Sequence, residues 1–513
     1  MYVGFLYNKN AMKKVNNITL AAILVSVASL CSCAASQSSV DTVNPDDETN
    51  PGAKIGLKIG DPYKRIEGIG EDVQNGFFDS FETLNPDNWV VGQGYWGLNN
   101  GGVSPDNVSI TDDGVLALRG NGNYYAKNEV TSYGAYRDGR KCGATLISKF
   151  GVAPGHYEIK MKVFPRQGAC TAFWTYANRA VPGQVDNENA EIDIELPGGS
   201  KSGKITFKKS LNTNWITENA VDSVEYAIKD VDPSADYVAY NDGEWHTFGF
   251  DWYTDPECVV YYCDGVITNI SNIFIPTLEG RLWVGVWFPN GFTGVANFET
   301  DFMYVDYIMY NPFTNQPYNE FDAAPSVAAA SDAVYSKDPV AVVPANKVSN
   351  GDFEYVGKLP DEDPAELDAA IAARGWEFSK KVSEKAEQKE VAWIEKGIGS
   401  ADGEGYAAFV KNGGVIRQTI DSVYDGYTYD FSFLGKPDKS NDEGCYMTLN
   451  FVGAASDDIL GTQKFVINDA SDFQKYSARV TAPVGTESIK LEIRSGNGNR
   501  VIVDDVKLEM VNK

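Results

Sequence analysis

Histidine is almost absent from this sequence, since only His156 and His246 occur among 513 residues. A Ser or Cys nucleophile usually depends on a His base, and zinc sites usually take His or Cys ligands. No Cys-x-x-Cys pair, Gly-x-Ser-x-Gly elbow, dinucleotide-binding pattern or phosphate loop is present. These absences disfavour triads and zinc sites, so acid and base chemistry falls to Asp and Glu.

Positive charge is also scarce. The chain has 44 Lys and Arg against 71 Asp and Glu, a formal net charge of −27. Long-range repulsion therefore disfavours nucleic acid and other polyanionic partners, whereas a neutral partner meets no such barrier.

The N-terminus carries an apolar run, residues 18–30, that is too short for a comfortable membrane span. It follows Met12, Lys13 and Lys14, as expected of an export signal, and closes on LCSC, which resembles the bacterial lipobox. We therefore expect a lipoprotein signal peptide over 1–33, lipidation of Cys33 and anchoring to the bacterial cell envelope, at the outer membrane or cell surface. An ordinary cleaved signal is the alternative.

Five cysteines remain after the signal, and an odd number cannot all pair. One disulfide is possible, with Cys142 and Cys170 as candidates, and the sequence does not decide whether it forms.

Short alternating runs with turn residues between them fill 77–313, after a polar tether and N-terminal extension over 34–76. One run, HYEIKMKVF, places Tyr157, Ile159, Met161 and Val163 on one side, and WHTFGFDWY and CVVYYCDGV read as neighbouring strands. This pattern predicts an all-β sandwich or barrel.

A stretch rich in Ala, Pro and Ser, residues 314–346, reads as a linker. A second, smaller β-rich unit follows over 347–513, with one helical candidate from Asp363 to Gly375. We therefore expect two all-β domains.

The run AEIDIE carries the strongest candidate site. Successive strand side chains point to opposite faces, so Glu191, Asp193 and Glu195 share one face while Ile192 and Ile194 face the core. A solvated strand face is the other interpretation of such a pattern. The Cα atoms of Glu191 and Glu195 should lie about 13 Å apart, and two glutamates leaning together could reach the roughly 5 to 5.5 Å of a retaining glycosidase. Asp193 between them would raise the pKa of its neighbours.

With its flanking strands, AEIDIELPG resembles the active-site strand of glycoside hydrolase family 16. Four further runs match the order of that family's strands: FFDSFETLNPDNW, LISKFGVAPGHYEIKMKV, WHTFGFDWYTDPECVVYYCDGV and MYVDYIMYNP. The resemblance implies a β-jelly-roll sandwich over 77–313. It also implies Glu191 as nucleophile, Asp193 as assisting residue and Glu195 as acid/base, with no cofactor for catalysis.

The resemblance implies a retaining endo-glycosidase that hydrolyses β-1,3-glucans, mixed-linked β-1,3-1,4-glucans or both. A β-galactan hydrolase and a xyloglucan-type transglycosylase of the same family are the alternatives, and a non-catalytic glycan-binding lipoprotein is the competing class. Asp193 and Glu195 are separated as in the regular strand of licheninases. Ala190, Thr145 and Ile147 depart from the licheninase pattern and put its substrate in doubt.

Flat aromatic side chains suit the apolar faces of sugars. The candidate substrate-binding residues are Trp174, Tyr176, Trp283, Trp287, Tyr95 and Trp96, with core packing as the alternative for Trp283.

The family often binds a structural calcium ion, which here implies Asp306. The second unit, from VSNGDFE to VDDVKLE, resembles carbohydrate-binding jelly rolls. That resemblance implies a further calcium site at Glu354 and Asp505, and candidate sugar platforms at Trp376, Trp393, Tyr427 and Tyr429.

Overall fold

The structure is a computed structural model. It describes residues 55–323 and 345–512, with gaps at 67, 70–75, 95–101, 126–140, 199–207, 290–292, 355–374, 380–390, 398–404, 438–443, 456 and 469–471. The signal, Cys33, Tyr95, Trp96, most of the linker and the helical candidate from Asp363 lie outside the described residues. Within them, no helix is long and apolar enough to cross a membrane.

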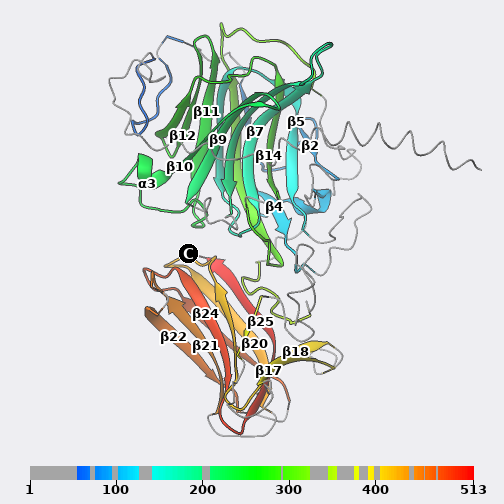
Figure 1. Ribbon diagram of the computed structural model, residues 1–513, viewed down its shortest axis with the longest axis vertical. Coiled ribbons are helices and arrows are strands. Elements are labelled where there is room, and N and C mark those ends of the chain that lie inside the picture. The colour runs from blue at the N-terminus through cyan, green and yellow to red at the C-terminus, as the bar shows by residue number, and fades with distance from the viewer. Residues whose placement is uncertain are drawn as a thin grey trace, which may run out of the picture.

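Two sheets form the N-terminal sandwich (Figure 1). The eight-stranded sheet has the order β13 (Val266–Ser271), β12 (Glu257–Cys263), β11 (His246–Thr254), β6 (Gly155–Lys162), β15 (Thr300–Pro312), β4 (Leu116–Asn121) and β3 (Val108–Ile110), with β1 (Phe77–Asp79) paired to β15. The seven-stranded sheet has the order β10 (Ala220–Ala227), β9 (Lys209–Thr217), β8 (Glu188–Pro197), β7 (Cys170–Arg179), β14 (Gly280–Trp287), β5 (Ala144–Val152) and β2 (Trp89–Val91). Two short helices, η1 (Pro105–Asn107) and α3 (Ile228–Val231), join strands.

Two further sheets form the C-terminal sandwich. One has the order β16 (Glu377–Phe378), β19 (Val415–Ile420), β24 (Ser488–Ser495), β21 (Cys445–Val452) and β22 (Ile459–Val466). The other has the order β17 (Ala392–Lys396), β18 (Tyr406–Lys411), β25 (Arg500–Asn512), β20 (Thr428–Pro437) and β23 (Gln474–Thr481). The all-β prediction is confirmed for both sandwiches.

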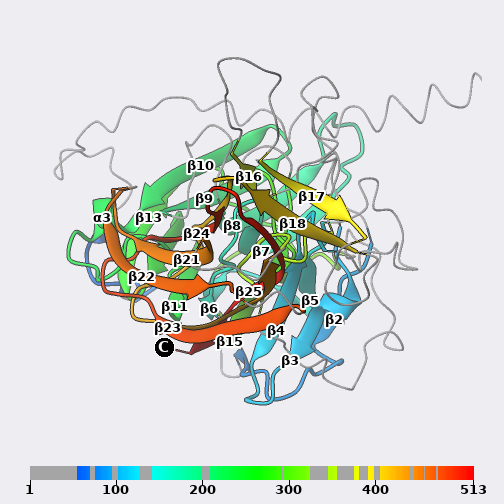
Figure 2. The ribbon, with the colours of Figure 1, turned by 90° about the horizontal axis from the view of Figure 1, so that it is seen from below.

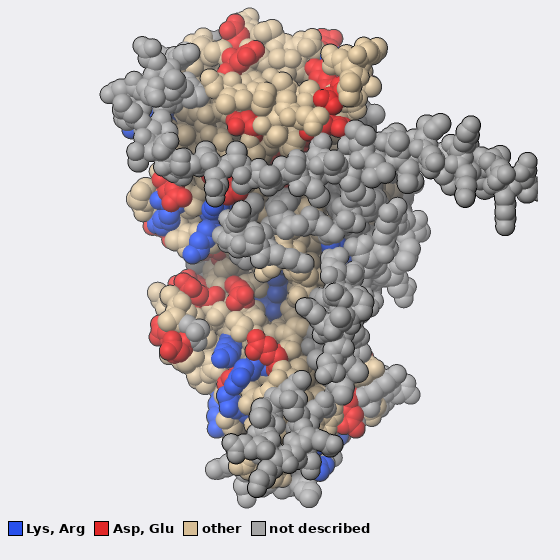
Figure 3. Space-filling view, in the orientation of Figure 1, with Lys and Arg blue, Asp and Glu red and all other residues tan. Residues whose placement is uncertain are grey.

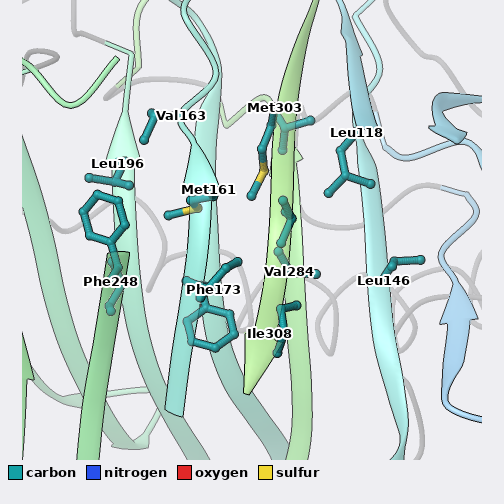
Figure 4. Packing of buried hydrophobic residues seen from close by; sticks show 14 of the residues in the cluster. Leu118, Leu146, Met161, Val163, Phe173, Leu196, Phe248, Val284, Met303 and Ile308 are labelled. Atoms are coloured by element: carbon teal, nitrogen blue, oxygen red, sulfur yellow. The ribbon is translucent and has the colours of Figure 1, made fainter. Parts of the chain in front are cut away.

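Strand alternation decides which side chains enter the N-terminal core. On β6, Tyr157, Ile159 and Met161 are buried, whereas Glu158 and Lys160 between them are partly exposed. Figure 4 shows how side chains from both sheets meet between them; the labelled residues are Leu118, Leu146, Met161, Val163, Phe173, Leu196, Phe248, Val284, Met303 and Ile308. The predicted inward face of HYEIKMKVF is therefore confirmed. The predicted pairing of β11 with β12 is also present, and Asp264 and Gly265 both adopt positive φ in the turn that follows.

The cysteines of the described region are all thiols. Cys142, Cys170, Cys258, Cys263 and Cys445 are buried and form no disulfide with one another, so the candidate bond between Cys142 and Cys170 is absent here.

The described part of the N-terminal extension lies on the outer face of the eight-stranded sheet. Leu57 and Ile66 are buried there in a small apolar cluster that includes Tyr253 of β11. The hydroxyl of Tyr63 donates to Asp251 Oδ2 at 2.9 Å, and the Tyr63 ring stacks on Tyr262. Residues 55–66 are thus folded against the sandwich, on the side away from the seven-stranded sheet.

The C-terminal sandwich lies across one end of the N-terminal sandwich (Figure 2). Asp301 of β15 accepts hydrogen bonds from Arg166 Nε and Lys347 Nζ, each at 2.8 Å, and all three side chains are buried. Arg166 also donates to the backbone oxygens of Asn346 and Lys347. Because Asn346 and Lys347 begin the C-terminal unit, this charge network joins the two sandwiches.

Three of the candidate sugar platforms in the C-terminal unit belong to its core. Trp376, Tyr427 and Tyr429 are buried among the apolar side chains between its sheets, so their interpretation as platforms is wrong. Trp393 is half-buried and stacks on Phe409, with their ring centroids 4.5 Å apart.

Candidate active site

Strand β8 carries the three predicted acids on one face. Ile192 and Ile194 point the other way and are buried in the core between the sheets. Glu191, Asp193 and Glu195 therefore share the outer face of the seven-stranded sheet. Asp193 is 5% exposed, and the two glutamates are half-buried. A freely solvated strand face is excluded by this burial.

The register of β7 sets one row of neighbours. Tyr176 lies beside Glu191, Trp174 beside Asp193, and Ala172 beside Glu195. Pairing runs without a shift from Cys170 to Arg179. The regular strand between Asp193 and Glu195 that the spacing predicts is therefore confirmed.

Strand β9 supplies the other row. Trp215 lies beside Glu191 and Thr213 beside Asp193. The indole Nε1 of Trp215 donates to Asp193 Oδ2 at 3.1 Å. Trp215 was not a sequence-based candidate, because a single sequence does not reveal which residue of β9 faces the acids.

Two further residues contact the glutamates and were also missed. Asn189 Nδ2 donates to Glu191 Oε2 at 2.8 Å, and Cys170 Sγ donates to Glu195 Oε1 at 3.7 Å. Strand alternation is the signal that could have found both residues. Asn189 continues the row of Glu191 on β8, and Cys170 continues the row of Ala172, Trp174 and Tyr176 on β7.

Burial controls the protonation of the acids because it disfavours the charged form. It raises the pKa of Glu191 to about 7, with a further rise from the charge of Glu195, while hydrogen bonds from Asn189 and Asp193 act in the opposite direction. Burial also raises the pKa of Glu195 to about 7. For Asp193, burial and the charges of Glu191 and Glu195 hold the pKa well above its usual range. Burial and the two neighbouring charges thus favour the protonated form of Asp193, whereas the hydrogen bond from Trp215 favours its carboxylate.

These shifts lead to a pH prediction. If Glu191 must be ionised and Glu195 protonated, acid inactivates the site by protonating Glu191 and base inactivates it by deprotonating Glu195. With both pKa values near 7, we expect kcat/KM to form a narrow bell centred near pH 7, falling about tenfold per pH unit on the outer limbs. Initial rates of the catalysed reaction from pH 5 to pH 9 would measure it. A flat plateau across that range would contradict it.

An aromatic cluster lies beside the acids on the same outer face. It comprises Trp174 and Tyr176 of β7, Trp283 and Trp287 of β14, and Ile147 of β5. The rings of Trp174 and Trp283 stack with centroids 5.4 Å apart, and Tyr176 meets Trp283 edge-on. Trp283 is 1% exposed, whereas Tyr176 and Trp287 are half-buried and retain surface. The structure therefore brings four of the six predicted substrate-binding residues together.

The three departures from the licheninase pattern lie in different places. Ala190 faces away from the acids and packs with Ala177, Leu278 and Ala323. Its side chain is thus part of the support beneath the site. Thr145 is buried and donates to the Val284 oxygen at 2.8 Å, while Ile147 belongs to the aromatic cluster. Thr145 and Ile147 both lie on the outer face of β5, beside Gly285 and Trp283 of β14, and both are fully buried.

The carboxylates predicted to bind calcium have other partners. Asp306 forms an ion pair with Lys160 at 2.7 Å, Asp505 lies 3.5 Å from Lys507 Nζ, and Glu354 accepts from the Tyr406 backbone. Calcium takes six to eight oxygen ligands, but the described residues contain no group of three or more His, Cys, Asp or Glu side chains placed to hold a metal ion. Calcium binding by Asp306, Glu354 and Asp505 therefore stays a prediction.

A jelly-roll sandwich that carries a row of acids beside aromatic rings is an architecture found in glycoside hydrolases. Residues 104–287 match the family described as Glycosyl hydrolases family 16. The Beta-glucanase of Paenibacillus macerans is 30% identical over 225 residues, which are 43% of this chain and 78% of that protein. The Beta-glucanase of Bacillus subtilis (strain 168) is 28% identical over 225 residues, 43% of this chain and 76% of that protein. The chain belongs to glycosyl hydrolase family 16.

Among solved structures, the Bacillus licheniformis beta-glucanase is 21% identical and has a TM-score of 0.36, covering 46% of this chain and 97% of its own.

Proposed function

We propose that this glycoside hydrolase is a retaining endo-glycosidase acting on β-1,3-glucans, mixed-linked β-1,3-1,4-glucans or both. The observation that carries the proposal is the outer face of β8, where Glu191 and Glu195 flank Asp193 beside the aromatic cluster. The relatives named Beta-glucanase support the substrate class.

The proposed reaction proceeds in two displacements. The Glu191 carboxylate attacks the anomeric carbon, the glycosidic C–O bond breaks, and the leaving oxygen takes the proton of Glu195. Glu195 then removes a proton from water as the water oxygen attacks the same carbon and releases Glu191. Asp193 stands between the two glutamates on β8. Burial and their charges favour its protonated form, which can donate a hydrogen bond to the Glu191 anion as it attacks and as it departs.

The surface around the acids suits a neutral polysaccharide. Tyr176 and Trp287 offer exposed ring area on which sugar faces can stack. On the face shown in Figure 3, acidic side chains are spread over both sandwiches, and Lys and Arg are seen mainly over the lower part of the N-terminal sandwich and over the C-terminal sandwich. The net charge of −27 adds a general penalty for anionic polymers.

The test combines a polymer panel with product stereochemistry. The protein is incubated with barley β-glucan, laminarin, lichenan, xyloglucan and agarose, and released reducing ends are measured. On the preferred polymer, proton NMR during the first minutes identifies the anomer formed. We expect cleavage of one or more of the first three polymers with initial release of the β-anomer. Initial release of the α-anomer would show an inverting enzyme. Cleavage of xyloglucan or agarose alone would show that the substrate is not a β-1,3-glucan or a mixed-linked β-glucan.

A further inference from the structure

The two glutamates of the site have unlike hydrogen-bond donors. Glu191 receives an amide N–H from Asn189 at 2.8 Å, whereas the donor to Glu195 among the described residues is the thiol of Cys170, at a sulfur to oxygen distance of 3.7 Å. An amide is a good donor and a thiol is a weak one. Both carboxyls are half-buried, and burial raises the pKa of both. Asp193 between them favours the ionised form of Glu191, as Asn189 does.

The donor at Glu191 is part of a built arrangement. Asn189 is 6% exposed, so its amide is shielded from competing water. The pairing of β8 with β9 shifts between Glu188 and Glu191, and Asn189 lies inside this bulge. Bulges next to active sites re-aim side chains. The neighbouring pair Asn178 and Asn187, joined at 2.8 Å, fixes the adjacent end of the β7–β8 hairpin.

A hydrogen bond to the charged form of an acid favours ionisation. The Asn189 amide therefore favours the carboxylate of Glu191, while the weak thiol contact leaves Glu195 free to keep its proton. We propose that Asn189 is a positioning residue which holds Glu191 as the attacking anion and thereby decides which glutamate is nucleophile and which is acid/base. This inference rests on the proposed function and adds the residue that gives the two glutamates their different roles.

Kinetics of Asn189→Ala and Asn189→Asp would test the inference. Both variants remove the amide donor, and the second adds a competing carboxylate in nearly the same volume. Because the pKa of Glu191 rises without the amide, we expect the acidic limb of the pH profile of kcat/KM to shift to higher pH by about one unit in Asn189→Ala and by more in Asn189→Asp. At pH 7 the value of kcat/KM should fall about tenfold. Asn187→Ala is the matched control, because Asn187 contacts Asn178 and not Glu191. Its acidic limb should not move.

A second substrate separates this effect from damage to the fold. An aryl β-glucoside with a dinitrophenyl leaving group needs no proton from Glu195, so its cleavage reports on Glu191 alone. On it, Asn189→Ala should regain nearly wild-type kcat/KM above pH 8, where Glu191 ionises without help, whereas a merely distorted site would stay slow. Cys170→Ala should leave the acidic limb unchanged on both substrates.

The outcomes distinguish this inference from the proposed function. If the wild type cleaves no β-glucan, the proposed function is wrong. If the wild type is active but neither Asn189 variant moves its acidic limb relative to Asn187→Ala, the role of Asn189 is wrong and the proposed function is unaffected. Should Asn189→Ala fail to fold by circular dichroism, the isosteric Asn189→Asp decides alone.

Discussion

Glu191→Ala is expected to hydrolyse β-glucan at least on the order of 10⁴-fold more slowly than the wild type, because no other described group on this face can replace the attacking carboxylate. Removal of the side chain also leaves space beneath the anomeric carbon. A small anion such as azide can enter that space and displace an activated leaving group directly from the opposite side. With a dinitrophenyl β-glucoside, Glu191→Ala in azide should therefore yield the α-glycosyl azide.

The partner variant gives the opposite stereochemistry. In Glu195→Ala, Glu191 still forms the glycosyl-enzyme on the activated substrate, and azide then displaces Glu191 to give the β-glycosyl azide. On polymer, where the leaving sugar needs a proton, Glu195→Ala should be nearly inactive. NMR of the two azides identifies each product. An α-azide from Glu195→Ala and a β-azide from Glu191→Ala would show that Glu195 is the nucleophile and Glu191 the acid/base. Rates like those of the wild type in both variants would show that neither glutamate takes part in the reaction.

Strand alternation made much of the fold and the row of acids predictable. An apolar residue at every second position is visible in one sequence, as in Tyr157, Ile159 and Met161, and the same rule placed Glu191, Asp193 and Glu195 on one face. Contacts across strands depend on register, which no local pattern encodes. The indole of Trp215 on Asp193 and the thiol of Cys170 on Glu195 were therefore absent from the candidates, although Cys170 stands on the predicted face.

The burial of individual aromatic side chains also could not be predicted from the sequence. Alternation shows that Trp283 faces away from the core valines, yet its near-complete burial depends on Trp174 and Tyr176 from another strand. Likewise, Tyr427 and Tyr429 read as possible sugar platforms until the second sheet covers them. The family resemblance supplied the roles of the acids, while it could not supply the donors that distinguish one glutamate from the other.

Asp301→Asn is expected to be the most destabilising of the conservative changes considered. Burial alone would raise the pKa of Asp301, but the Lys347 ammonium and the Arg166 guanidinium hold it below its usual range. Neutralising this carboxylate leaves two buried cations facing each other without an anion. Breaking a buried pair in this way costs about 3–5 kcal/mol. For a unit of this size that corresponds to a fall in Tm of about 10 °C.

The location of Asp301 makes the effect reach beyond one sandwich. Asn346 and Lys347 are the first residues of the C-terminal unit, and Arg166 donates hydrogen bonds to their backbone oxygens. Loss of the network should therefore weaken both the junction between the sandwiches and the packing around Asp301. Scanning calorimetry of the full chain should show the lower Tm, and limited proteolysis should cut faster near residue 346.

Asp430→Asn is the matched control. Asp430 pairs with Arg479 through two bonds of 2.8 Å, but both side chains are largely exposed, and exposed pairs contribute little. Its Tm should stay within about 1–2 °C of the wild type. If Asp301→Asn melts together with Asp430→Asn, the buried network does not join the sandwiches, and their contact depends on other hydrogen bonds, such as those from the Tyr427 hydroxyl to the Gly243 oxygen and the Glu244 carboxylate.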